Sequence, residues 1–325
     1  MKKTGIAALL SMNLFGAGAA AATAVTDHEL GRPEGVRHYL LAQPAADAGT
    51  RLPLVILLHG HGASAAWMVG RESFAGYTAR DWLRLAEREH ILLIAPQGVN
   101  GSDGKAAWND CRADATTNAE TDDVGFISAL IDKAVAEHRA DPRRIYVFGT
   151  SNGGGMAYRL GIELGPRLAA IGVQSALMPA RSKCQPPTYP LPLFITHGTA
   201  DKIAPYAGGD VGHWALRGRG TGLSVDESAA IWRKLAQLPE TAASYRFPHA
   251  EMSKDTSATR YLWGSDPAGL QIALLRIDGG GHTHSSTTEK LPWLLGKMLG
   301  EVNHDVNTSD AAWEFFRDKR AAPKE

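Results

Sequence analysis

The chain has 325 residues, with 34 basic and 34 acidic side chains and a formal net charge of zero. Balanced charge provides no long-range field to attract nucleic acid or an anionic membrane surface, so we expect neither as a partner and expect a neutral substrate instead. A hydrophobic content of 44% is typical of an ordinary globular protein and argues against a disordered chain.

The N-terminus has the pattern of an export signal. Two lysines precede an apolar stretch rich in alanine and glycine, and a small-x-small pattern follows at residues 22–24. We predict a signal peptide over residues 1–24 and a single domain over residues 25–325, secreted or periplasmic. A membrane anchor is the weaker alternative, because the stretch is short and poor in strongly apolar residues.

The chain has only two cysteines, Cys111 and Cys184, which are 73 residues apart. An exported protein meets an oxidising compartment, which favours a disulfide between them over two free buried thiols. Neither cysteine has the spacing of a metal or redox motif.

From about residue 53 onward, strand-like apolar runs alternate with helical patterns. The predicted strands are 54–58, 91–95, 145–148, 170–173, 193–196 and 272–277. The predicted helices are 81–89, 122–139, 225–238, 289–299 and 310–319, with Asp122 or Asp123 as the N-cap of the second. Strands that are apolar on both faces and alternate with helices predict an α/β fold, a mostly parallel sheet with helices on both faces. Ligands of such sheets bind beyond the C-terminal strand ends.

The pattern Gly149-Thr150-Ser151-Asn152-Gly153 follows one of these strands and opens a helix. A nucleophile elbow requires this context, because the sharp strand-to-helix turn leaves room only for small neighbours. A glycine-rich structural turn is the alternative. We predict Ser151 as a nucleophile, which requires a histidine base and an orienting carboxylate.

In a fold with this elbow, the acid and then the histidine follow the nucleophile along the chain. Asp201 lies just past the strand at 193–196 and is the predicted acid, with Asp210 as a second candidate. His197, in the same segment, is expected to be a packed, hydrogen-bonded histidine.

Three glycines precede His282 after the strand at 272–277, and His282 is the predicted base. His284 is a competitor that spacing alone does not exclude. A metal site at these two histidines lacks a supporting carboxylate or cysteine cluster, so we expect no metal and no cofactor.

Acyl transfer also requires donors for the developing oxyanion. We expect one to be the backbone N–H of Asn152, directly after the nucleophile. The other is expected from the segment His59-Gly60-His61-Gly62, with the backbone N–H of His61 as the candidate.

Several ordered motifs extend over nearly all of the chain after residue 24. They are LHG at 58–60, AP-G at 95–98, Trp108 followed by Cys111, DDVGFI at 122–127, DPRRIYVFGTSNGG at 141–154, HGTAD at 197–201, SVDESAAIW at 224–232, GGGHT at 279–283 and AWEFF at 312–316. Together they resemble the polyhydroxybutyrate depolymerase-like esterases, α/β-hydrolases close to bacterial feruloyl and acetylxylan esterases.

The resemblance implies a serine carboxylic ester hydrolase with a Ser151–Asp201–His282 triad and a Cys111–Cys184 disulfide. It also favours His282 over His284. The chain departs from the family in two places. It has His284-Ser285-Ser286 where the family often has Trp-Pro-Gly, and it has His61 where the family often has glycine.

The substrate stays open at this point between hydroxyalkanoate oligomers and feruloyl or acetyl esters of plant polysaccharide. Trp67, Trp108 and Trp214 are candidates to line a cleft, although core packing is the commoner role of tryptophan. The segment Tyr206–Leu223 is either a lid or, as we expect, a long surface loop. A non-catalytic binding protein on a hydrolase scaffold is a remote alternative.

Overall fold

The computed structural model describes residues 23–47, 49–73, 80–212 and 217–323. The signal peptide predicted at residues 1–24 lies outside these ranges except for its last two residues. In the described part of the chain, no helix is both long enough and apolar enough to cross a membrane.

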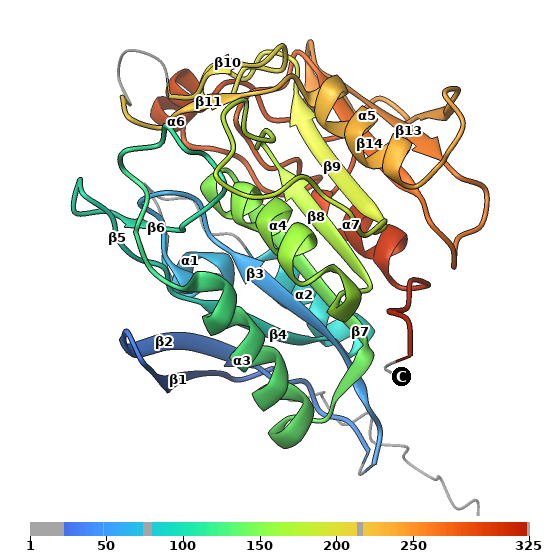
Figure 1. Ribbon diagram of the computed structural model, residues 1–325. Helices are drawn as coiled ribbons and strands as arrows, with labels where there is room; N and C mark the ends of the chain where they lie inside the picture. The colour runs from blue at the N-terminus through green and yellow to red at the C-terminus, as the bar shows by residue number, and fades with distance from the viewer. Residues whose placement is uncertain (1–22, 48, 74–79, 213–216, 324–325) are drawn as a thin grey trace, which may run out of the picture.

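A ten-stranded sheet forms the centre of the molecule (Figure 1). In spatial order its strands are β1 (Val25–Arg32), β2 (Gly35–Ala42), β4 (Leu92–Pro96), β3 (Leu52–Leu58), β7 (Ala140–Thr150), β8 (Ala170–Gln174), β9 (Leu193–Gly198), β14 (Ile272–Asp278), β13 (Ser257–Trp263) and β12 (Ala243–Arg246). The strands from β4 to β14 in this order run parallel, and antiparallel pairs lie at both edges. The mostly parallel sheet predicted from the sequence is confirmed.

Helices cover both faces of the sheet. One face packs against α3 (Asp123–Glu137), α4 (Asn152–Glu163) and α5 (Val225–Leu235), which lie in front of the sheet in Figure 1. The other face packs against α1 (Ala65–Met68), α2 (Asp81–Glu89) and α7 (Thr308–Phe316). Two 3₁₀ turns (Gly165–Arg167 and Glu251–Ser253) and α6 (Trp293–Leu299) complete the helices of the described residues.

The side chains of β3 alternate between the two faces of the sheet, and both faces are buried, which explains why its sequence is an unbroken apolar run. Its Val55 and Leu57 belong to the core on one face, and Ile56 and Leu58 belong to the core on the other. All four side chains are fully buried. A central parallel strand covered by helices on both sides therefore needs no polar residue.

Local capping determines where the helices begin. The Asp122 side chain accepts a hydrogen bond from the backbone N–H of Gly125 and caps α3, as predicted. A capping box between Ser224 and Glu227 opens α5. The helix predicted at 289–299 is shorter in the structure, because α6 begins only after Pro292. A proline disfavours helical geometry at the residue that precedes it.

Several elements had no clear sequence signal. They are the edge strands β1, β2, β12 and β13 and the short pairs β5 (Val99–Asn100) with β6 (Ala106–Ala107) and β10 (Gly209–Asp210) with β11 (Thr221–Gly222). The β10–β11 ribbon lies within the segment predicted as a lid or plain loop. Residues 213–216 of that segment, including Trp214, lie outside the described residues.

A disulfide joins Cys111 to Cys184, with an S–S distance of 2.00 Å and a Cα–Cα distance of 5.3 Å. Next to it, Arg112 and Ser182 form an isolated antiparallel bridge. The disulfide therefore ties together two loops that are distant in sequence.

We expect the Cys184→Ser variant to lose about 4 kcal/mol of unfolding free energy, because opening the 73-residue loop restores entropy to the unfolded chain. Urea unfolding of the wild type with and without reductant measures the effect. The double variant with both cysteines replaced by serine is the control, since reductant should not affect it. A wild-type midpoint that does not move on reduction would contradict the prediction.

Candidate active site

The turn from β7 into α4 holds Ser151 in a strained conformation, with φ 56° and ψ −122°. A Cβ on Gly149 would lie 2.0 Å from the backbone oxygen of Gly153, and a Cβ on Gly153 would lie 2.3 Å from that of Leu58. Both glycines are therefore required by contacts between backbones. The absence of a Cβ at these two positions allows the chain to turn this tightly beside β3.

Asp201 and His282 are brought together from loops 81 residues apart in the chain. His282 Nδ1 lies 2.8 Å from Asp201 Oδ2, and the other carboxylate oxygen accepts hydrogen bonds from the backbone N–H groups of Ile203 and Ala204, both at 2.8 Å. Burial of Asp201 favours its neutral form, but adjacent His282 and the hydrogen bonds outweigh burial and hold its pKa below the ordinary value. The carboxylate is thus ionised and fixed against the imidazole.

Among the hydrogen bonds of the described residues, none joins the Ser151 hydroxyl to His282 within 3.5 Å. Such bonds are often long in an enzyme without substrate and tighten when substrate binds. The two side chains come from the C-terminal ends of β7 and β14, at the same edge of the sheet.

The competing acid and the neighbouring histidine occupy other positions. Asp210 is exposed on β10. His197 is buried, and its Nε2 lies 2.8 Å from the carbonyl oxygen of Ala204 and 3.4 Å from Asp201 Oδ2. His197 is thus a packed, hydrogen-bonded residue, as expected.

One expected oxyanion donor, Asn152, belongs to the elbow, and the other, His61, belongs to the loop that follows β3. The backbone N–H of His61 has no acceptor among the described residues. Asn152 is the first residue of α4, so its backbone N–H has no acceptor within the helix. Both groups are available to a ligand.

Side-chain contacts stiffen both segments. His61 Nε2 lies 3.0 Å from Asp103 Oδ2, while burial and nearby Arg219 lower the pKa of His61. The buried Asn152 side chain contacts both backbone polar groups of Trp108, as well as Asp110. The Asn152 amide is thus part of a polar network beneath the elbow.

Trp108 does not line a cleft, which corrects the suggestion from the sequence. It is fully buried, and its Nε1 donates to the carbonyl oxygen of His59 at 2.8 Å. Trp108 is a core residue that braces the segment before His61.

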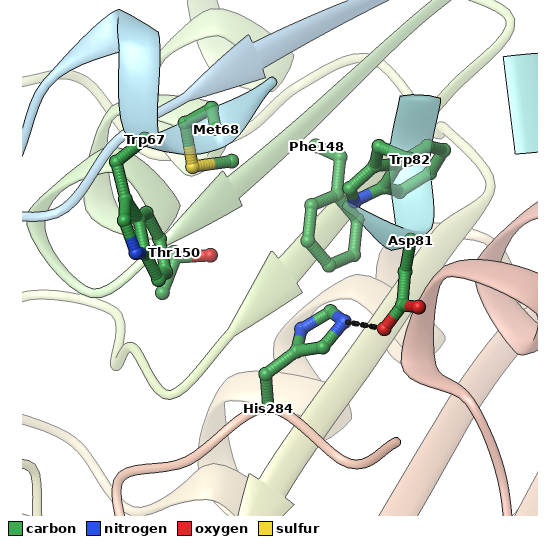
Figure 2. A pocket seen from close by; sticks show the side chains of 7 residues that line it. All are labelled: Trp67, Met68, Asp81, Trp82, Phe148, Thr150 and His284. Atoms are coloured by element: carbon green, nitrogen blue, oxygen red, sulfur yellow. Dashed lines mark ion pairs between the residues drawn. The ribbon is translucent and has the colours of Figure 1, made fainter. Parts of the chain in front are cut away.

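Trp67 does line a small pocket, which begins beside the residue that precedes Ser151 (Figure 2). The cavity has a volume of about 20 Å³, and its walls are Trp67, Met68, Asp81, Trp82, Phe148, Thr150 and His284. A cavity of this size holds about one water molecule. It is mainly apolar, with His284 and Asp81 on one side.

His284 belongs to a separate polar network. Its Nδ1 lies 2.9 Å from Gln174 Oε1, and its Nε2 lies 3.5 Å from Asp81 Oδ2. Burial disfavours the charged form of Asp81, but His284 and Arg84 outweigh burial and keep its pKa low. The sequence interpretation missed Gln174 and Asp81. A polar residue at the end of an apolar strand was the available signal for Gln174.

The rings of His282 and His284 face different carboxylates, so they do not share a metal-ligand arrangement. In the described ranges, the group of potential metal ligands that lies close enough together is Cys111, Glu163 and Cys184. Its two sulfurs are joined in the disulfide and offer no thiolate ligand.

Solved structures support the fold. An acetyl xylan esterase from Aspergillus awamori superposes with a TM-score of 0.55 and 14% identity, covering 90% of this chain and 99% of that one. A thermostable esterase superposes with a TM-score of 0.52 and 16% identity, covering 91% of this chain and 63% of that one. At such low identity the likeness shows the α/β-hydrolase fold alone.

Esterases are among the known sequences to which this chain is similar. The chain is 27% identical over 270 residues to NocK of Nocardia uniformis subsp. tsuyamanensis, which carries an esterase name, covering 81% of this chain and 74% of NocK. It is 25% identical over 286 residues to a poly(3-hydroxybutyrate) depolymerase of Ralstonia pickettii and 26% identical over 274 residues to feruloyl esterase B of Piromyces equi. These matches cover 87% and 81% of this chain but only 51% and 45% of those two relatives.

The family described as esterase PHB depolymerase matches residues 37–184, which include the elbow, both cysteines and the segment around His61. The resemblance noted from the sequence motifs is confirmed. Residues 37–184 thus belong to the esterase PHB depolymerase family, and the protein is a carboxylic ester hydrolase with the α/β-hydrolase fold.

Proposed function

We propose that the protein is a secreted serine esterase that works by two-step acyl transfer. His282 accepts the proton of Ser151 as the serine oxygen attacks the ester carbonyl. His282 then protonates the leaving alcohol, and afterwards activates the water that releases the acid. Asp201 orients the imidazole and stabilises its charged form.

The observation that carries the proposal is the Asp201–His282 pair, 2.8 Å apart at the sheet edge where Ser151 is held in the elbow. The Asp201 carboxylate requires a proton on His282 Nδ1, which leaves Nε2 as the basic nitrogen. A neutral imidazole in this tautomer is the form that a serine nucleophile needs.

We assign oxyanion stabilisation to the backbone N–H groups of His61 and Asn152. Each is free of protein acceptors among the described residues, and each belongs to a segment held rigid by buried contacts. Donors that need not reorganise during the reaction stabilise the transition state by about 2.7 to 4 kcal/mol each.

For the substrate, we propose short-chain hydroxyacyl esters, including hydroxyalkanoate oligomers. The pocket beside Thr150 has room for about one water molecule, so an acyl group entering it would displace Trp67 or Trp82, and a short acyl group would displace them less than a feruloyl ring. Acetyl esters of polysaccharide remain the second candidate, favoured by 24% identity over 270 residues to a bifunctional acetylxylan esterase/xylanase of Neocallimastix patriciarum.

Export is part of the proposal and is supported by the disulfide, which persists in oxidising compartments. Mass determination of the protein recovered from periplasm and medium tests it. A chain beginning near residue 25 is the expected result, whereas an intact N-terminus in the cytoplasm would contradict export.

A fluorophosphonate probe tests the serine mechanism directly. The probe should label the protein at one equivalent, and peptide mapping should place the label on Ser151. Failure to react would instead favour a non-catalytic binding protein on this scaffold.

A panel of esters with one leaving group tests the acyl preference. We expect kcat/KM for acetyl and 3-hydroxybutyryl esters to exceed that for the feruloyl ester by ~10-fold or more, the scale on which apolar pockets discriminate by size. Trp67→Ala should narrow the difference, and Trp293→Ala, an exposed change on α6, should not. Faster cleavage of the feruloyl ester by the wild type would contradict a short acyl preference.

A further inference from the structure

Gln174 lies beside the nucleophile at the end of β8. In the parallel pairing of β7 with β8, Gln174 is opposite Thr150. The backbone carbonyl oxygen of Gln174 accepts a hydrogen bond from the backbone N–H of Ser151 at 2.8 Å. The side chain is 3% exposed, so its amide is removed from water and needs protein partners.

Those partners are both in the loop that carries the catalytic histidine. Gln174 Nε2 donates to the carbonyl oxygen of Thr283 at 3.2 Å, and Oε1 accepts from His284 Nδ1 at 2.9 Å. Thr283 and His284 are the two residues that follow His282. One side chain therefore connects the strand end beside Ser151 to the main chain and to a ring just after His282.

Other hydrogen bonds of this loop lead to other elements, such as that from the Thr283 hydroxyl to the carbonyl oxygen of Glu301 at 2.9 Å. The backbone N–H groups of Gly281 and His282 donate to the carbonyl oxygens of Glu301 and Leu299, and the His282 ring is turned by Asp201. These contacts join the loop to other elements, whereas the side chain of Gln174 joins it to the strand end beside Ser151.

His284 is held from its other side by α2. Its Nε2 lies 3.5 Å from Asp81 Oδ2, and Asp81 is a buried residue in the first turn of α2 that also pairs with Arg84 (Figure 2). Both contacts of His284 are to acceptors, because Nδ1 faces an amide oxygen and Nε2 faces a carboxylate. His284 thus links Gln174 to a fixed anion at one side of the pocket.

We infer that Gln174 is a positioning residue that sets the separation of Ser151 and His282, with His284 and Asp81 holding its amide in place. The inference rests on the proposed roles of Ser151 and His282. Misplacement of a reacting group by ~1 Å costs up to about 10²-fold in rate. Because a positioning residue acts through His282 and not on the substrate itself, we expect the loss in kcat and not in KM.

Gln174→Met tests the inference, because methionine has a similar length but neither donates nor accepts as an amide does. We expect kcat on a short ester to fall about 10- to 100-fold with KM within twofold. The rate of fluorophosphonate labelling should fall by the same factor and still reach one equivalent. Gln174→Glu, which keeps the acceptor for His284, should recover part of the rate.

Gln271→Met is the matched control. Gln271 is also buried, but its amide bonds to the Gly264 carbonyl before β14 begins, away from His282. Turnover per labelled site should match the wild type, even if thermal stability falls.

His284→Phe provides a second route if Gln174→Met does not fold. It should lower kcat in the same direction. Where Gln174→Met does fold, the double variant should lose no more kcat than Gln174→Met alone, because both changes break one chain of contacts. The downfield proton resonance of the His282–Asp201 hydrogen bond should persist in each variant.

Two results would overturn the inference. One is a folded Gln174→Met protein whose kcat stays within twofold of the wild type. The other is unchanged turnover per labelled site with lower stability, which would make Gln174 merely structural. A wild-type protein that the probe does not label at Ser151 would instead contradict the proposed function.

Discussion

Ser151→Ala is expected to lower kcat/KM for a short-chain ester by roughly 10⁶-fold, the scale on which removing the nucleophile of a serine hydrolase acts. The loss is large because no covalent intermediate forms, while the oxyanion donors and the binding pocket remain. The protein should stay folded, since alanine occupies less space at a turn whose glycines provide the close contacts. Initial rates with a chromogenic acetyl ester measure the effect.

Ser224→Ala is the matched control for that variant. Ser224 caps α5 through its hydroxyl, far along the chain from the elbow, and losing the cap costs about 1 kcal/mol of stability. Its kcat/KM should equal that of the wild type. A loss of less than tenfold in Ser151→Ala would exclude Ser151 as the nucleophile.

Asp201→Asn is expected to lower kcat by roughly 10⁴-fold with the fold retained, because the variant holds the wrong tautomer of His282. One carboxylate oxygen of Asp201 accepts from the backbone N–H groups of Ile203 and Ala204, so the amide oxygen of asparagine must take that place. The amide NH₂ then faces His282 Nδ1 and donates to it. The ring proton moves to Nε2, which can no longer accept a proton from Ser151.

Asp210→Asn is the control for this variant, since Asp210 is the exposed carboxylate that the sequence offered as a second acid. It should leave kcat unchanged. Steady-state kinetics at neutral pH and the far-UV circular dichroism of both variants decide the matter. Equal losses in the two variants would contradict the assignment of Asp201.

Much of the fold followed from local patterns. The helix predicted at 81–89 coincides with α2, and Asp122 caps α3 as expected. Central strands were visible because burial on both faces demands unbroken apolar runs. Edge strands such as β1 and β12 were not, because their exposed residues carry no such requirement.

The sequence by itself determined the tight turn at Ser151, because such a turn depends on short-range contacts between neighbouring residues. It also identified Asp201 and His282 as candidates, since each follows a strand that ends at the same sheet edge. The sequence did not determine which of these candidates contact one another.

Only the tertiary structure decided that Asp201 contacts His282, that Trp108 is buried, and that His284 faces Gln174 and Asp81. Gln174 and His284 are 110 positions apart in the chain. Their meeting depends on strand order and on the register that sets Gln174 opposite Thr150. Contacts across a sheet are fixed by the pairing of distant segments, and the secondary-structure preferences of each segment do not determine that pairing.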